Sequence, residues 1–85
     1  MAEIKLKNMR VEDLDAIYDS RKSFYGKAKI LKTSKVIELF SYDALVASYN
    51  WVTKILWITE ELAYHTMTTN RHIREFQKQI ENGDL

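Results

Sequence analysis

Apolar and polar side chains alternate along much of residues 23–49, as is typical of half-buried β-strands joined by short turns. In residues 24–31, one face is small or apolar and the other is basic. The first face carries Phe24, Gly26, Ala28 and Ile30, and the second carries Tyr25, Lys27, Lys29 and Leu31. Residues 36–42 are partly apolar on both faces, which favours a strand at the centre of a sheet. The pattern therefore predicts the core of a β-meander.

Further strands are expected on both sides of this core. Residues 44–49 and 54–59 resume the alternation after a bend at Asp43 and a turn at 50–53, and residues 62–65 predict a short extra strand. Residues 3–9 predict an edge strand with its lysines toward water.

Residues 11–18 leave two interpretations open. Their apolar spacing favours one helical turn or an irregular crossing of the chain. The alternation of Leu14, Ala16 and Tyr18 also fits a strand that pairs with the next segment.

The final element is an amphipathic helix that begins near Thr66 or Thr68 and stops at Asn82-Gly83. Its apolar stripe carries Thr69, Ile73, Phe76 and Ile80, and its wet face carries Arg71, Arg74, Glu75 and Lys78. Arg71 and Glu75 are four residues apart, a spacing that favours an ion pair on that face. A helix of this length is not stable alone, so it must lie on the sheet.

These elements predict one α+β domain over residues 1–85. It is an antiparallel β-meander of four or five strands with one C-terminal amphipathic helix packed on a face. The predicted core consists of Ala28, Ile30, Val36, Phe40, Leu45, Ala47, Ile55, Trp57, Ile73, Phe76 and Ile80.

Composition narrows the classes of protein. The chain has no cysteine, so disulfides and thiolate metal sites are excluded. No apolar run is long enough to span a bilayer, and residues 1–10 lack the apolar region of a signal peptide, so no membrane contact and a cytoplasmic location are expected.

The charge is unevenly distributed. Residues 1–35 carry nine Lys and Arg against five Asp and Glu, whereas residues 36–85 carry four against seven. Residues 20–35 hold six basic side chains and no acidic one. Such a bias can mark a surface for phosphate or for an acidic partner.

Residue patterns for catalysis or metal binding are weak. His65 and His72 are the only imidazoles and show no ligand spacing, so His65 is expected at the start of the helix and His72 on its flank. The serines lie outside any Gly-x-Ser-x-Gly elbow, and two glycines cannot form a P-loop or a dinucleotide fingerprint. No enzymatic activity, metal or cofactor is therefore expected.

Two features are candidates for partner binding. The basic run from Arg21 to Lys35 can follow a phosphate backbone, with Arg21, Lys22, Tyr25, Lys27 and Lys29 as its candidate binding residues. Alternatively, these lysines only cover the wet face of a strand. Trp51 lies in a predicted turn, where it either anchors a partner or folds back over its own hairpin.

Three segments together resemble a family of small uncharacterised proteins encoded by phages and other mobile elements of bacteria. They are Ser20–Ile30, Ser41–Tyr49 and Thr68–Gln79, with the patterns Ser23-Phe24-Tyr25-Gly26-Lys27-Ala28, Ser41-Tyr42-Asp43 and Arg71-His72-Ile73-Arg74-Glu75-Phe76. The chain departs from the family pattern at residues 57–65, which are longer and more acidic. The resemblance implies a meander-plus-helix fold and a mobile-element origin, but no activity.

The expected function is that of a non-enzymatic, phage-type binding protein. Its concrete form is an anti-CRISPR-like inhibitor that blocks a host defence nuclease by stoichiometric occupation of a surface, so the partner would be a host protein or ribonucleoprotein in the host cytoplasm. The alternative is a small nucleic-acid-binding protein that uses the basic run. A homodimer joined through an exposed sheet edge is a third interpretation.

Overall fold

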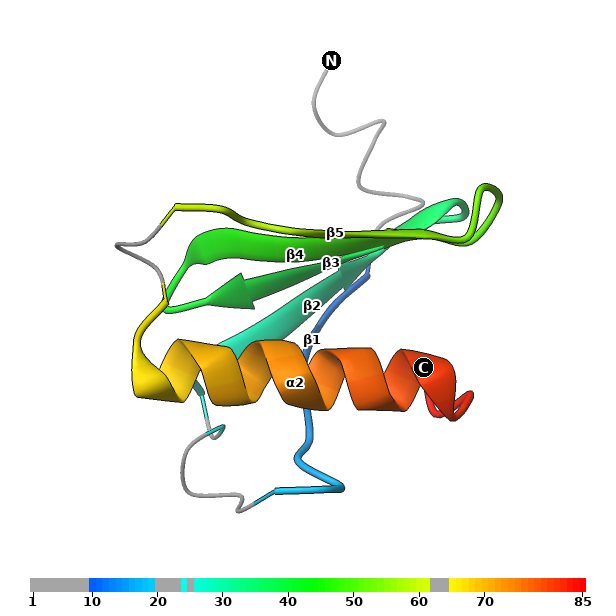
Figure 1. The fold of residues 1–85 in the computed structure, drawn as a ribbon. Coiled ribbons are helices and arrows are strands. Elements are labelled where there is room, and N and C mark those ends of the chain that lie inside the picture. Colours follow the sequence, from blue (N-terminus) through cyan, green and yellow to red (C-terminus); the bar gives the residue numbers. More distant parts are fainter. Residues whose placement is uncertain (1–9, 20–23, 25, 62–64) are drawn as a thin grey trace.

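The computed structural model describes residues 10–19, 24, 26–61 and 65–85. Five strands follow one another and form one antiparallel sheet in the order β1-β2-β3-β4-β5. They are β1 (Arg10–Asp13), β2 (Ala28–Lys32), β3 (Val36–Ser41), β4 (Ala44–Asn50) and β5 (Ile55–Ile58), and the helix α2 (Met67–Glu81) follows them. Figure 1 shows α2 lying across one side of the sheet. The predicted meander-plus-helix fold is thus confirmed, with five strands and a central β3.

Two of the connections owe their tightness to residues with positive φ. Tyr42 and Asp43 have φ values of 50° and 67°, the conformation of a type I′ turn, and join β3 to β4. Between β4 and β5, the side chain of Asn50 accepts hydrogen bonds from the N–H groups of Val52 and Thr53, and Lys54 has φ of 63°. The bend and the turn predicted at these places are both confirmed.

The first described segment resolves the ambiguity of residues 11–18. Residues 10–13 form β1, which pairs with β2 in a register that sets Val11 opposite Leu31 and Glu12 opposite Ile30. The favoured helical turn is therefore wrong for residues 11–13, where the alternative of a strand is correct. Residues 14–19 then cross irregularly, as expected. The strand predicted at 3–9 lies outside the described residues, as does most of the one at 62–65.

The core lies between α2 and the side of the sheet that carries Ile37 and Leu39. Its buried apolar residues are Leu14, Phe24, Ala28, Ile30, Ile37, Leu39, Val46, Ala47, Ile73 and Phe76. Val46 and Ala47 are both buried although they are consecutive. The reason is that the β3–β4 register shifts at Leu39/Phe40, which breaks the strict alternation.

The predicted core is correct for Ala28, Ile30, Ala47, Ile73 and Phe76, and Ile80 packs half-buried against it. It is wrong for Val36, Phe40, Leu45, Ile55 and Trp57, which lie on the opposite side of the sheet. Both sides of β3 are apolar, and only the position of α2 decides which one is sealed.

The helix begins and ends as its sequence predicts. Thr66 is the N-cap, because its side-chain oxygen accepts a hydrogen bond from the N–H of Thr69. Asn82 is the C-cap, and Gly83 follows it with φ of 75°. Among the described residues, no helix is long and apolar enough to cross a membrane.

Candidate functional site

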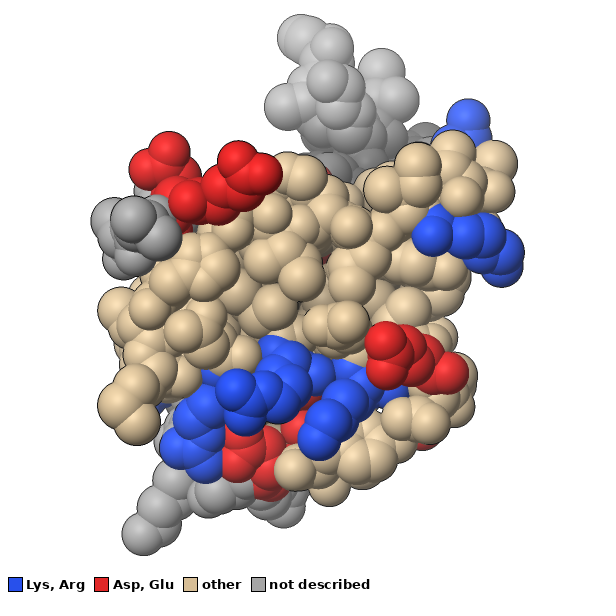
Figure 2. All heavy atoms as spheres, viewed as in Figure 1, with Lys and Arg blue, Asp and Glu red and all other residues tan. Residues whose placement is uncertain are grey.

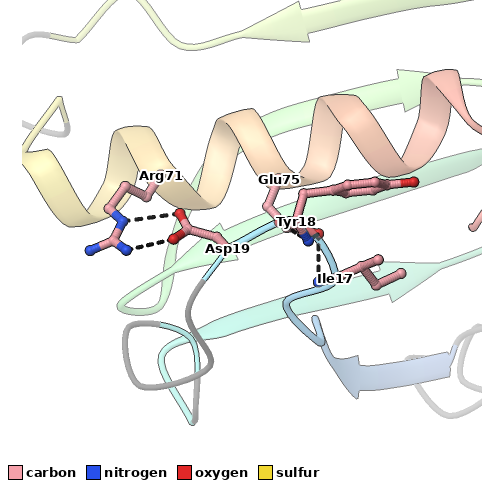
Figure 3. A network of polar contacts seen from close by, with 5 residues as sticks. All are labelled: Ile17, Tyr18, Asp19, Arg71 and Glu75. Carbon is pink, nitrogen blue, oxygen red and sulfur yellow. Dashed lines mark hydrogen bonds and ion pairs between the residues drawn. The ribbon is translucent and has the colours of Figure 1, made fainter.

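The flank of α2 is joined to residues 17–19 by a buried carboxylate. Glu75 is 2% exposed, and its carboxylate accepts hydrogen bonds from the backbone N–H groups of Ile17 at 2.8 Å and of Tyr18 at 3.0 and 3.1 Å (Figure 3). The amide of Gln79 donates to the same carboxylate and to the carbonyl of Asp15, both at 2.6 Å. Every oxygen of this buried acid is therefore hydrogen-bonded, which is the condition for burying a charge at acceptable cost.

The prediction of an ion pair between Arg71 and Glu75 is wrong. Arg71 instead forms a two-pronged contact with Asp19, at 3.0 Å from Nε and 2.5 Å from Nη2 (Figure 3). This contact raises the pKa of the Arg71 guanidinium above its ordinary value, chiefly through the hydrogen bond to Asp19. The two sites of attachment, at Glu75 and at Arg71, hold residues 17–19 alongside the helix.

The side chain of Tyr18 is held in place by α2 and by the residues that follow it. Its hydroxyl donates to the Asp84 carboxylate at 2.6 Å, and the Lys78 ammonium lies 5.9 Å from the centre of its ring. The hydrogen bond to Asp84 raises the pKa of Tyr18, with smaller effects from desolvation and from the charges of Asp84 and Glu75. The ring therefore has a defined position although it is partly exposed.

An open groove of about 540 Å³ lies between α2 and residues 17–19. We call it the α2 groove; it is lined by Tyr18, Asp19, Met67, Asn70, Arg71, Arg74, Glu75 and Lys78. Figure 2 shows Lys and Arg side chains gathered over α2 on this face of the molecule. The sequence pattern predicts a wet face with Arg71, Arg74, Glu75 and Lys78, which is wrong for Glu75, because that side chain is buried against residues 17–18. Nothing in the pattern shows that residues 17–19 lie beside this face.

A second candidate surface is the side of the sheet that faces away from α2. The register sets Val11, Leu31, Glu38, Ser48 and Trp57 in one row across all five strands. Neighbouring rows on the same side contain Lys29, Phe40 and Leu45, and Val36, Asn50 and Ile55. We call this side the open face. Several of its apolar side chains are strongly exposed: Val11 at 67%, Ile55 at 63%, Trp57 at 46% and Leu45 at 37%.

Of the predicted binding residues, the structure describes Lys27, Lys29 and Trp51. Arg21, Lys22 and Tyr25 lie outside the described residues. Lys27 is exposed in the turn before β2, and Lys29 is exposed on the open face. Among the other lysines of the basic run, Lys32 pairs with Glu12 at 3.6 Å.

Trp51 is half-buried and packs against the core, with its ring edge-on to Tyr49 at a centroid distance of 5.0 Å. This position matches the interpretation in which it folds back over its hairpin. The exposed tryptophan is Trp57, which the sequence reasoning had assigned to the core.

The histidines fill packing positions. His65 lies at the start of α2 as expected: its Nε2 donates to the carbonyl of Thr59 at 2.7 Å, and its Nδ1 lies 2.9 Å from the Oδ1 atom of Asn70. His72 is fully buried rather than on the flank, 4.7 Å from the ring of Phe24, with Nδ1 at 2.8 Å from Ser41 Oγ. Because Ser41 is buried with it, this pair has no route to a substrate. The described residues contain no cluster of three or more potential metal ligands.

Comparison with protein families places residues 13–84 in a family of unknown function, DUF8033. Because the match spans most of the chain, the protein belongs to this family. Neither the curated proteins nor the solved structures contain a significant match to the chain. The membership carries no statement about a phage or mobile-element origin, which stays a prediction from the residue patterns.

Proposed function

We propose that the protein is a non-enzymatic binding protein that holds another protein against the open face of its sheet. The observation that supports this proposal is the exposure of Ile55 and Trp57, which are neighbours on the open face of β5. A small domain buries its large apolar groups where it can, and a contiguous exposed apolar surface marks an interaction site more often than an isolated exposed residue does.

The composition of the open face suits a protein partner. Trp57 supplies a large apolar ring, the type of side chain that most often dominates the energy of an interface. Ile55 and Leu45 add aliphatic area close to it, while Lys29 and Glu38 provide charges among the apolar positions. Val11 lies on the edge strand β1, Ile55 and Trp57 lie on the edge strand β5, and Glu38 and Ser48 lie between them on β3 and β4.

The specific form that we propose is stoichiometric blockade of a host defence nuclease. Its support is the resemblance of the residue patterns to proteins of mobile elements, together with a domain small enough to act by occupying a surface. Affinity would then come from a few buried anchors, with Trp57 first among them.

The test compares two variants in which exposed aliphatic or aromatic groups become serine. Trp57→Ser with Ile55→Ser removes the exposed apolar side chains of β5 from the open face, and Val52→Ser is the control, because Val52 is 70% exposed but lies in the turn before β5. Tagged proteins are used to capture partners from a bacterial lysate, and the captured proteins are quantified by mass spectrometry. A partner is then purified and its affinity is measured for each variant.

We expect the double variant to lose binding by at least about 2 kcal/mol, as for loss of an interface anchor, and Val52→Ser to bind as the parent does. A partner that binds both equally would contradict the proposal. Sedimentation equilibrium of the protein alone provides a second check: a dimer that dissociates in the double variant would show that the open face serves self-association instead. If the partner is a nuclease, its activity should fall to a plateau at one equivalent of the protein.

A further inference from the structure

We propose that the α2 groove binds a small phosphate monoester, whose dianionic group lies between Arg74 and Lys78. This site is separate from the open face and does not depend on the function proposed for it. The argument rests on the walls of the groove, on its unbalanced charge and on the surface that it offers to the rest of a ligand.

The walls are held in place before any ligand arrives. Glu75 fixes the backbone of Ile17 and Tyr18, and Arg71 fixes Asp19, so residues 17–19 cannot collapse onto the helix or move freely away from it. A preformed site saves the ordering cost that a flexible loop would impose on binding. A volume of about 540 Å³ is also within the range that small-molecule sites have.

Both acidic side chains of the groove already have hydrogen-bond partners within the protein. The Glu75 carboxylate is buried and bonded to three donor groups, and Asp19 is engaged with Arg71. Arg74 and Lys78 are exposed, and neither forms an ion pair with the residues that the structure describes. Three cations (Arg71, Arg74 and Lys78) and two acids (Asp19 and Glu75) line the groove, so its net charge is +1, and its exposed charges are the cations of Arg74 and Lys78.

The spacing of this pair is itself a reason to expect an anion. Residues four apart on a helix are neighbours, with about 5–6 Å between their Cβ atoms, and like charges at this spacing destabilise a helix. A phosphate monoester carries about two negative charges at neutral pH, so when it lies between the two cations it offsets their repulsion. The guanidinium of Arg74 can also donate two parallel hydrogen bonds to the phosphate oxygens.

The remainder of the groove suits the organic part of the ligand. The ring of Tyr18 lies beside Lys78, and the Met67 side chain is 85% exposed. Asn70 also lines the groove, with its amide already in contact with His65. A flat or apolar body can lie on these groups while its phosphate contacts Arg74 and Lys78. An extended nucleic acid is less suited, since two exposed cations beside the carboxylates of Asp19 and Asp84 cannot follow a chain of phosphates.

The test is a titration of the whole chain, labelled with nitrogen-15, with phenyl phosphate as the probe and with amide shifts as the measurement. We expect saturable shifts confined to residues 17–19 and 67–78. Phenyl sulfate has the same body and a single charge, and inorganic phosphate has the charge without the body. Both are expected to bind the same amides at least about fivefold more weakly.

Arg74→Gln with Lys78→Gln should weaken the binding of phenyl phosphate by about tenfold or more, because two charge-assisted contacts are lost. The matched control is Lys35→Gln with Lys54→Gln, which removes the same net charge from two exposed turn positions outside the groove and should leave the affinity unchanged. Trp57→Ser should also bind normally, so failure of this site and failure of the open-face proposal are distinguishable.

Four results would overturn the inference. They are the absence of saturable shifts up to about 10 mM phenyl phosphate, equal weakening by the two double variants, equal binding of phenyl sulfate or of inorganic phosphate, and tighter binding of random single-stranded DNA to the same amides.

Discussion

The carboxylate of Glu75 accepts hydrogen bonds from two backbone N–H groups that lie nearly sixty positions away, and it is almost completely shielded from water. Hydrogen bonds to a charged group are worth more than neutral ones, and a buried donor left without an acceptor carries a desolvation cost. A single side chain therefore determines whether residues 17–19 can lie on the helix.

Glu75→Gln should lower the free energy of unfolding by about 2–3 kcal/mol, because the amide presents its own donors to the N–H groups of Ile17 and Tyr18. Urea unfolding followed by circular dichroism measures the loss. Arg74→Gln, at the adjacent exposed position, should change the stability by less than about 0.5 kcal/mol. Similar losses in the two variants would show that the Glu75 contacts contribute nothing.

Tyr18 makes a contribution to the stability of the folded protein that depends on pH, and the direction of this dependence follows from its pKa. Its pKa is raised above the ordinary value of 10.0, chiefly because its hydroxyl donates to Asp84. A raised pKa in the folded state means that the contribution is complete below pH 10 and is lost as the pH rises through the folded pKa.

Asp84→Asn should bring the pKa of Tyr18 back toward its ordinary value. Ultraviolet absorbance of tyrosinate against pH should show one tyrosine that titrates earlier in the variant than in the parent. Tyr18→Phe identifies this transition by removing it. An unchanged titration curve in Asp84→Asn would mean that Asp84 does not hold the proton on Tyr18.

At the scale of elements, the ends of α2 follow from local chemistry and could be read from the sequence. A threonine before the apolar stripe and an Asn-Gly pair after it are strong signals because each satisfies orphan backbone groups. Which of two threonines caps the helix could not be decided, since both precede the stripe. The turn between β3 and β4 was similarly open, because Tyr42 and Asp43 lack the glycine that usually reveals a type I′ turn.

The two threonines give a matched pair of variants for the cap. Thr66→Ala should cost about 1 kcal/mol, because the N–H of Thr69 loses its acceptor. Thr68→Ala lies inside α2, where alanine is the better helix former, and should be neutral or slightly stabilising. Thermal unfolding of both variants measures the difference. A larger loss of stability in Thr68→Ala would show that Thr66 is not the N-cap.

For the whole molecule, the sequence could predict that a helix covers a meander of four or five strands but not which side it covers. β3 has Ile37 and Leu39 on one side and Val36 and Phe40 on the other, so hydrophobicity does not distinguish them. For the same reason, the candidate surfaces could not be predicted from the sequence. The open face became visible only when Ile55 and Trp57 were found exposed, and the α2 groove depends on contacts between residues far apart in the chain.

Alanine substitutions on the two sides of β3 test which one is sealed. Leu39→Ala should cost about 2–5 kcal/mol, as for truncation of a fully buried leucine. Phe40→Ala should cost less, although more atoms are removed, because that ring lies half-buried on the open face. Denaturant unfolding ranks the two losses. The opposite ranking would show that α2 covers the side of the sheet that carries Val36 and Phe40.

The attachment of residues 17–19 to α2 has a kinetic consequence. Each strand pairs with its neighbour in sequence, so the sheet can assemble through short-range hairpins, whereas the Ile17–Glu75 and Asp19–Arg71 contacts close loops of 58 and 52 residues. Contacts that form after the rate-limiting barrier have little influence on the speed of folding and govern how slowly the native state opens. We therefore expect the hydrogen bonds that shape the groove to slow unfolding more than they speed folding, and any molecule seated there to slow unfolding further.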